Sequence, residues 1–296
     1  MFVTPQELTT DNAVGNGRVA LIFEYDGTAF HGWQLQKSGV PSVEAMLARA
    51  VAKVADHPVD LVCAGRTDAG VHASYQVVHF DTPSIRNLRS WVMGINTAMS
   101  GAVSVHWAGN VDESFHARFS AVYRRYRYLI YNHPVRPAIL RHQVSWNYRP
   151  LDADAMDRAA QVLVGEHDFS SFRAAGCQSR TPHRNLQRIA VARHGDYLVI
   201  DVQANAFLHH MVRNIAGALM TVGCGQRPEA WIRDILEARD RTLAGVTAPP
   251  FGLYLVDVGY PAGFGLPVSR PGPAFTRGWV EPMNTGVDTG EVSENR

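Results

Sequence analysis

The stretch that decides the fold is Arg18–Gly27, with the sequence RVALIFEYDG. Its branched and aromatic residues end at the turn signal Asp26-Gly27, which predicts a strand over Arg18–Tyr25. Ser42 then caps a predicted helix, because apolar residues follow it at helical spacing. Three further strands are predicted over Val59–Ala64, Tyr75–Asp81 and Val103–Ala108, and a second helix is predicted over Leu88–Met99. The order is therefore βαββαβ, a split βαβ unit with a mostly antiparallel sheet.

The second half of the chain repeats this type of order without repeating its letters. Strands are predicted over Tyr123–Tyr131 and Gly252–Val258, and a hairpin turns at Gly195-Asp196. The other predicted elements are helices over Asp152–Val164, Phe207–Val222 and Pro228–Ala238 and the hairpin strands Leu186–Arg193 and Tyr197–Ala204. We expect an α+β fold of two similar mixed α/β halves, whose mainly antiparallel sheets flank a central cleft where ligands would bind.

The ends of the chain differ in composition from its middle. Residues 1–17 show no periodicity and predict a flexible arm, followed by an N-terminal α/β domain over 18–110 and a C-terminal one over 111–262. Residues 263–296 are rich in Pro and Gly, a composition that buries too little surface to offset its ordering entropy, so we expect a disordered tail.

The composition excludes several classes of protein. Of 296 residues 46% are hydrophobic and 19% charged, which is typical of a globular protein. Three cysteines, Cys63, Cys177 and Cys224, are an odd number, are widely spread and include no CxxC pair, which argues against a disulfide framework and against a cysteine zinc site. We found neither a signal peptide nor an apolar run of the ~20 residues that a membrane helix needs. We therefore expect a cytoplasmic protein without a membrane segment.

Basic residues are concentrated in one part of the chain. Between Phe115 and Ile215 there are 14 Arg against seven Asp or Glu, and eight of the 13 His also fall there. Such a segment indicates a contact surface for a polyanion. The high share of Arg over Lys is equally explained by a GC-rich genome, so only the clustering carries weight.

The segment Cys63–Ala73, CAGRTDAGVHA, is the strongest candidate for chemistry. Arg66 and Asp68 are two residues apart, so in extended backbone they project to the same side. An arginine beside an aspartate favours its ionised form, which suits a nucleophile or a general base. An ordinary Asp-Gly turn with a surface ion pair explains the same letters.

Two further segments combine aromatic and basic residues. In Tyr123–Tyr131, strand alternation places Arg124, Tyr126 and Tyr128 on one face and Tyr123, Arg125 and Arg127 on the other. Such a face can stack a base and hold phosphates, although aromatic residues are also simply common in strands. In FHARFSA, Phe115–Ala121, His116 and Arg118 between phenylalanines suggest a nucleic-acid contact or interdomain packing.

The segment HHMVRN, His209–Asn214, belongs to a predicted helix. Adjacent histidines on a helix face different sides, so His209 and His210 are not expected to share a metal ion. Arg213 is flanked by apolar residues and needs a partner, for which Asp68 is a candidate. Because GxGxxG, GxxxxGK[ST], HExxH and GxSxG are also absent, we expect neither a metal site nor a nucleotide cofactor.

Eight ordered motifs make the chain resemble the tRNA pseudouridine synthase A family from about Arg18 to Pro261. They are YDGTAFHGWQ (Tyr25–Gln34), CAGRTDAGVHA (Cys63–Ala73), YQVVHF (Tyr75–Phe80), FHARFSA (Phe115–Ala121), RRYRYLIYN (Arg124–Asn132), DFSSFRA (Asp168–Ala174), AFLHHMVRNI (Ala206–Ile215) and GLYL (Gly252–Leu255). Leu35 and Glu44 depart from residues usual in the family, which affects a peripheral RNA contact and not the chemistry.

The resemblance implies a pseudouridine synthase fold, a homodimer and isomerisation of uridines 38, 39 and 40 in the anticodon stem-loop of tRNA. Asp68 takes the place of the essential aspartate, the nucleophile, and Tyr126 that of the tyrosine that lies against the target base. Arg66 and Arg213 match the family's arginines near the aspartate, and Leu253 an apolar pocket residue. Together with Arg118 and His116 from the basic segment, Tyr126, Arg213 and Leu253 form the predicted substrate-binding set.

The reaction breaks the C1′–N1 bond of uridine and forms a C1′–C5 bond, so it needs no redox cofactor. Asp68 would attack C1′, attack C6 or remove a sugar proton. Tyr126 would stack on the uracil and accept the C5 proton, for which its pKa of about 10 must be lowered. Two rival functions remain: a non-catalytic RNA-binding module, and a hydrolase with a second carboxylate from Asp26 or Glu44.

Overall fold

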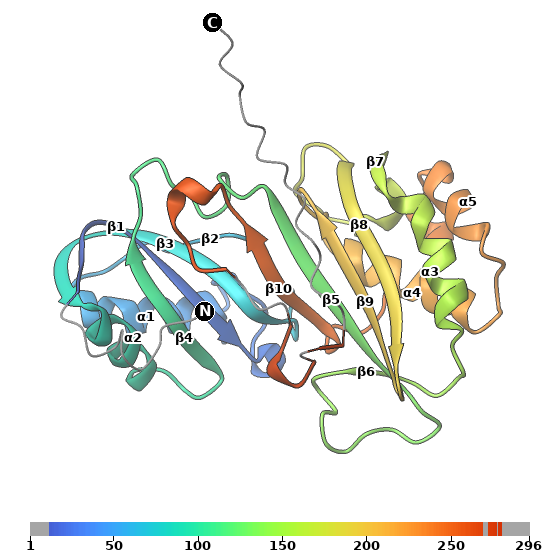
Figure 1. Ribbon diagram of the computed structural model, residues 1–296, viewed down its shortest axis with the longest axis horizontal. Helices are drawn as coiled ribbons and strands as arrows, with labels where there is room; N and C mark the ends of the chain where they lie inside the picture. Colours follow the sequence, from blue (N-terminus) through green and yellow to red (C-terminus); the bar gives the residue numbers. More distant parts are fainter. Residues whose placement is uncertain (1–11, 269–271, 277, 280–296) are drawn as a thin grey trace, which may run out of the picture.

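One twisted sheet spans the molecule. The computed structural model describes residues 12–268, 272–276, 278 and 279, and within them eight strands follow the order β4-β1-β3-β10-β5-β9-β8-β7, with β2 beside β3 and β6 beside β5 (Figure 1). Their bounds are β1 Ala13–Tyr25, β2 Val62–Cys63, β3 His72–Asn87, β4 Val103–Asn110, β5 Tyr123–Asn132, β6 Ser145–Asn147, β7 Gly165–Asp168, β8 His183–His194, β9 Tyr197–Ala204 and β10 Leu253–Gly259. The mixed, mostly antiparallel class is confirmed.

β10, the last strand in the described part of the chain, lies in the middle of the sheet. β10 pairs in parallel with β3 through Tyr254↔His72 and Leu255↔Ala73, and antiparallel with β5 from Leu253↔Tyr128 onward. The two predicted sheets are therefore one, because β10 bridges the strands of both halves. Whether the halves are separate folding domains stays a prediction.

Helices pack against both ends of the sheet. α1 (Val43–Ala55) and α2 (Leu88–Thr97) contact β1, β3 and β4, and α3 (Ala153–Ala160), α4 (Met211–Gly223) and α5 (Trp231–Ala238) lie at the opposite end (Figure 1). The predicted cap is confirmed, since the Ser42 hydroxyl accepts the Ala45 N–H. No helix in the described part of the chain is long and apolar enough to cross a membrane.

The middle of the sheet has a different environment on each face. Tyr126, Tyr128 and Ile130 of β5 belong to the main hydrophobic core, whereas Leu129 belongs to a smaller cluster. The smaller cluster also contains Val144, Val199, Tyr254 and Val256. Because neighbouring residues of a strand point to opposite faces, the two clusters lie on opposite faces of the sheet. The predicted alternation along β5 is thereby confirmed.

Several predicted boundaries are wrong. β1 begins at Ala13, so residues 13–17 are not part of a flexible arm. Gly15 lies directly against the backbone of β3, where an added Cβ would be 1.8 Å from the Ser84 carbonyl oxygen. The predicted long helices also start or end differently: α4 begins at Met211, and α3 is followed by a 3-10 turn, Gln161–Leu163. The short strands β6 and β7 escaped prediction because each is an edge partner of a longer strand.

Part of the tail predicted from Gly263 packs against the sheet. The Tyr75 hydroxyl donates to the Pro267 carbonyl at 2.6 Å, and the Trp279 ring lies 4.9 Å from that of Tyr197. Thr276 is fully buried. The prediction of disorder is therefore wrong for the described part of the tail, because aromatic residues anchor it. This part comprises residues 263–268, 272–276, 278 and 279. The remaining residues of the tail and residues 1–11 lie outside the described part.

A buried histidine makes stability depend on pH. His79 on β3 accepts the Ala117 N–H at Nδ1, and burial lowers its pKa to about 4. The unfolded chain takes up this proton near pH 6.5 while the native state stays neutral, so stability falls as pH falls. We compare how far the free energy of unfolding falls when the pH is lowered from 7 to 5.5. We expect this fall to be about 1 kcal/mol smaller in His79→Gln than in the unsubstituted protein. Urea unfolding at both pH values measures this, and equal losses would contradict it.

Candidate active site

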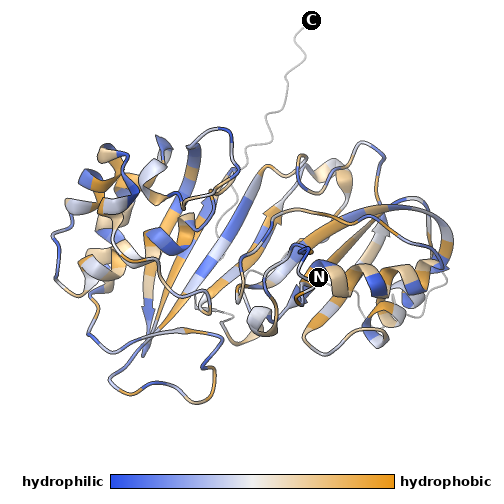
Figure 2. Ribbon diagram, turned by 180° about the vertical axis from the view of Figure 1, so that it is seen from behind, coloured by the Kyte–Doolittle hydropathy of each residue, from blue (hydrophilic) through white to orange (hydrophobic). Residues whose placement is uncertain are grey.

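A cleft of about 1040 Å³ opens between residues of both halves. Its walls come from the loop between β2 and β3, the segment before α4, and strands β5 and β10. Figure 2 shows β5 as a hydrophilic strand in the middle of the sheet. The predicted residues that line the cleft are Arg66, Asp68, Arg118, Tyr126 and Leu253.

The loop that carries Asp68 is fixed by its backbone. Gly70 has a φ of +76°, and the Val71 N–H closes a turn onto the Asp68 carbonyl at 3.1 Å. The Thr67 hydroxyl is buried against the Tyr25 hydroxyl at 2.8 Å. Since Thr67 points inward, Arg66 and Asp68 on either side of it face the cleft, as alternation predicts.

Arg124 on β5 holds the start of this loop. It is buried, and its guanidinium donates twice to the Ala64 carbonyl, at 3.2 and 2.9 Å. It also donates to the carbonyls of Asn205, Ala121 and Arg118. Sequence analysis placed Arg124 on the correct face but did not identify this role, because the carbonyls come from three separate segments.

The Asp68 carboxylate lies among three cationic or potentially cationic groups. Arg213 Nη1 is 3.3 Å from Oδ2, which confirms the predicted partner of Arg213. His209 Nε2 is 3.4 Å from Oδ1, and His210 Nε2 is 3.4 Å from Oδ2. The arginine within ion-pair distance of Asp68 is thus Arg213 from α4, whereas Arg66 is exposed.

The expectation that His209 and His210 face different sides is wrong. Helix α4 starts only at Met211, and His210 has a φ of +61°, in the left-handed region. This turn places the two rings side by side with centroids 4.0 Å apart. Burial lowers the pKa of His210; the negative charge of Asp68 opposes this shift, and Arg213 and His209 add to it.

Tyr126 forms part of the cleft floor. Its ring is 8% exposed and packs edge-on against Phe207, 5.0 Å between centroids. Leu253, from the neighbouring strand β10, also lies on the floor and is buried. Burial, together with the negative charge of Asp68, raises the pKa of Tyr126. The shift is opposite to the lowering that a general base requires.

The rim of the cleft presents Arg118 and Phe119. The Arg118 guanidinium lies 5.5 Å from the Phe119 ring centroid, and that ring is 75% exposed. His116 does not line the cleft; its Nδ1 accepts the N–H groups of Arg118 and Phe119 and shapes their loop. Arg125, on the other face of β5, is buried in an ion pair with Asp201 and is not exposed to a phosphate.

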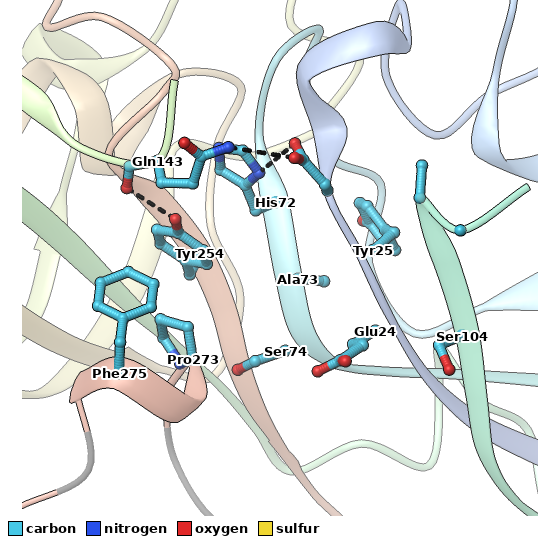
Figure 3. A pocket seen from close by; sticks show the side chains of 13 residues that line it. Glu24, Tyr25, His72, Ala73, Ser74, Ser104, Gln143, Tyr254, Pro273 and Phe275 are labelled. Atoms are coloured by element: carbon cyan, nitrogen blue, oxygen red, sulfur yellow. Dashed lines mark hydrogen bonds and ion pairs between the residues drawn. The ribbon is translucent and has the colours of Figure 1, made fainter. Parts of the chain in front are cut away.

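A second, smaller hollow of about 210 Å³ lies on the opposite face of the sheet, beside Tyr254 (Figure 3). Tyr254 and Phe275 form one side and Glu24 the other, with Ser74 between them (Figure 3). The carboxylate of Asp26 also lines it, and a hydrogen bond with His72 lowers the pKa of Asp26. Two carboxylates and no arginine are unsuited to a polyanion, so the cleft with Asp68 is the candidate site.

Comparisons with known proteins show the family to which the chain belongs. A family model described as tRNA pseudouridine synthase matches residues 21–120 and 159–261. The tRNA pseudouridine synthase A of Pseudomonas aeruginosa is 55% identical over 276 residues, 93% of this chain and 97% of that protein. Those of Pectobacterium atrosepticum and Alcanivorax borkumensis are 57% and 56% identical over 258 residues, 87% of this chain and 91% and 97% of theirs. Asp68 lies in the first matched range, Arg213 and Leu253 in the second, and Tyr126 between them.

The role of Arg124 can be tested by its removal. Arg124→Met leaves the carbonyls that the guanidinium bonds without their donor, so we expect a loss of about 3 kcal/mol in the free energy of unfolding. Urea unfolding measures this, with Arg118→Ala as a control that keeps its backbone carbonyl and should change stability by less than about 0.5 kcal/mol. Equal effects of the two substitutions would contradict the role.

Proposed function

The chain belongs to the tRNA pseudouridine synthase family, and from this we propose that it isomerises uridine to pseudouridine at positions 38, 39 and 40 of the anticodon stem-loop. One observation carries the assignment to a site. Asp68 lies in a cleft whose floor holds Tyr126 and Leu253, and Arg213 is 3.3 Å from its carboxylate. A carboxylate, a stacking ring and an apolar wall are what a uridine needs for this isomerisation.

Asp68 is the proposed nucleophile of the reaction. The C1′–N1 bond breaks, the uracil turns, and C5 bonds to C1′, while the C5 proton leaves and N1 gains a proton. Arg213 is itself held by a 2.8 Å hydrogen bond from Nε to the Ala248 carbonyl, so its position is fixed before substrate binds. It thereby orients Asp68 and balances its charge in a partly buried site.

Tyr126 is proposed to stack on the target uracil, with Leu253 beside it. The raised pKa keeps its hydroxyl protonated in the free protein. Tyr126 can therefore accept the C5 proton only if its own proton leaves in the same step. The stacking role needs no such transfer, because it depends on the face of the ring.

Arg66 and the rim residues are proposed to handle the RNA around the target. The uridine must leave the stem to reach Asp68, which costs a few kcal/mol of stacking. Arg66 is exposed two residues before Asp68 and can fill the vacated space. The exposed Phe119 ring and the Arg118 guanidinium beside it offer a stacking surface and a phosphate contact.

The resemblance also supports three statements about the setting of the enzyme. We propose tRNA as the substrate, a homodimer as the active form and the cytoplasm as the location. The loop after β5 presents exposed apolar side chains that a second copy could cover, namely Val135, Ile139, Trp146 and Tyr148.

The rival functions lose support from the geometry. A hydrolase would need a second carboxylate beside Asp68, but Asp26 lines the hollow on the other face. Glu44 lines the cleft, yet its Oε2 accepts the Leu35 N–H at 2.7 Å and is held there. A module that only binds RNA would have no use for a carboxylate facing phosphates.

Asp68→Asn tests the proposed function. We expect pseudouridine formation to fall at least about 10³-fold, since the amide can neither attack nor accept a proton. Binding of tRNA should stay within about threefold, because the side chain keeps its shape and the arginines are unchanged. Tritium release from tRNA with 5-tritiated uridine measures the reaction. Normal product from the variant would refute the nucleophile, and free uracil from the unsubstituted protein would favour a hydrolase.

Tyr126→Phe separates stacking from proton transfer. If the hydroxyl takes the C5 proton, the variant should bind tRNA and break the glycosidic bond but release tritium at least about 10²-fold more slowly. We expect this stall, because Tyr126 is the residue proposed to stack on the target uracil, whereas His209 and His210 lie at the Asp68 carboxylate. Release within about threefold of normal would make Tyr126 a stacking residue only.

A further inference from the structure

Asp68 has one imidazole at each of its carboxylate oxygens. His209 Nε2 is 3.4 Å from Oδ1 and His210 Nε2 is 3.4 Å from Oδ2. In the described part of the chain these three side chains form a group that could hold a metal ion, with all ligand atoms within 4.8 Å of one another. The proposed reaction uses the carboxylate but gives the two histidines no role.

The backbone holds both imidazoles in this arrangement. His210 adopts a φ of +61°, which costs a non-glycine residue about 1 kcal/mol and persists only where its surroundings fix it. The His209 carbonyl accepts the Ala174 N–H at 3.0 Å, and the His210 carbonyl accepts the Asn214 N–H at 2.9 Å. The pair is therefore set before any ligand arrives.

The donor set matches a transition metal. Two imidazole nitrogens and one carboxylate, with an open fourth position, are the ligands of many catalytic zinc sites. Bonds of about 2.1 Å in a tetrahedron place neighbouring ligand atoms about 3.4 Å apart, the separation of each imidazole nitrogen from its carboxylate oxygen. Mg²⁺ instead prefers oxygen ligands in an octahedron, so this set selects against it.

We propose that Asp68, His209 and His210 bind a divalent transition-metal ion such as Zn²⁺ in the RNA-free protein, and that this ion competes with tRNA for Asp68. Binding follows from the geometry of the three side chains. The competition rests on the proposed function, in which Asp68 must reach the target nucleotide. The cleft is open to solvent, so the ion enters without rearrangement: the three side chains are 23%, 44% and 28% exposed.

Arg213 opposes the ion. Its guanidinium lies 3.3 Å from Asp68 Oδ2 and repels a dication placed between the carboxylate and the imidazoles. Zinc affinity is therefore held down by a residue that is not a ligand. Removal of this charge should strengthen binding, whereas removal of any ligand should weaken it.

Calorimetric titration of the full-length protein with Zn²⁺, without RNA, tests the site. We expect one ion per chain, no binding of Mg²⁺, and affinity at least about tenfold weaker in His209→Gln, His210→Gln and Asp68→Asn. Arg213→Gln should bind about tenfold more tightly. His133→Gln is the matched control, because the His133 ring bonds to Val135 in its own loop and does not line the cleft, and it should bind as the unsubstituted protein does.

Replacement of Zn²⁺ by Co²⁺ gives a second measurement. Imidazole and carboxylate ligands in an approximately tetrahedral site produce visible absorption, which should be lost in His209→Gln and kept in His133→Gln. Circular dichroism of each variant shows whether it is folded. Equal Zn²⁺ affinity in the unsubstituted protein and the three ligand variants would overturn the proposal, as would unchanged or weaker binding in a folded Arg213→Gln.

Inhibition is the final test. Zn²⁺ should raise the KM for tRNA without changing kcat, and the same concentration should leave the residual activity of His209→Gln unaffected, which excludes binding to the RNA as the cause. A protein that binds Zn²⁺ as described but forms no pseudouridine would refute the proposed function and leave the site standing. An active protein that binds no Zn²⁺ would refute the site alone.

Discussion

The pairing of β10 with both β3 and β5 is the constraint on which the rest of the molecule depends. Hydrogen bonds to His72 and Ala73 on one side and to β5 on the other fix the two halves of the sheet relative to each other. Asp68 belongs to the loop that leads into β3, and Tyr126 belongs to β5. The strand between them therefore sets how far the carboxylate lies from the ring, and it contributes Leu253 to the same floor.

Electrostatics divide the sheet into two unlike faces. The cleft has Arg66, Arg118 and Arg213 near the carboxylate of Asp68, whereas the hollow beside Tyr254 has Glu24 and Asp26 and no arginine. A polyanion is attracted to the first and repelled by the second, so the charge pattern orients the RNA before any base is recognised. The nearly neutral net charge of the whole chain conceals this polarity.

Local signals in the sequence were enough for the order of the longer helices and strands, because periodicity, the Ser42 cap and the turn glycines act within a few residues. Local signals failed where contacts between residues far apart in the sequence determine the structure. Gly15 is part of β1, where its backbone packs against that of Ser84, and the described residues of the tail pack through aromatic side chains such as Trp279. In the site, the apolar residues that flank Arg213 correctly predicted that its charge needs a partner, and that partner is Asp68. The left-handed turn at His210 has no sequence signal of that kind, so the histidine pair was missed.

The central position of β10 has a consequence for how the protein is made. Residues 253–259 are synthesised after every other strand in the described part of the chain, yet they occupy the gap between β3 and β5. Until then the nascent chain has two sheet edges with unpaired backbone groups, which are sites for wrong association. Closure of the sheet and assembly of the cleft are thus one late event. A chain that ends before β10 lacks both Leu253 and the strand that joins β3 to β5.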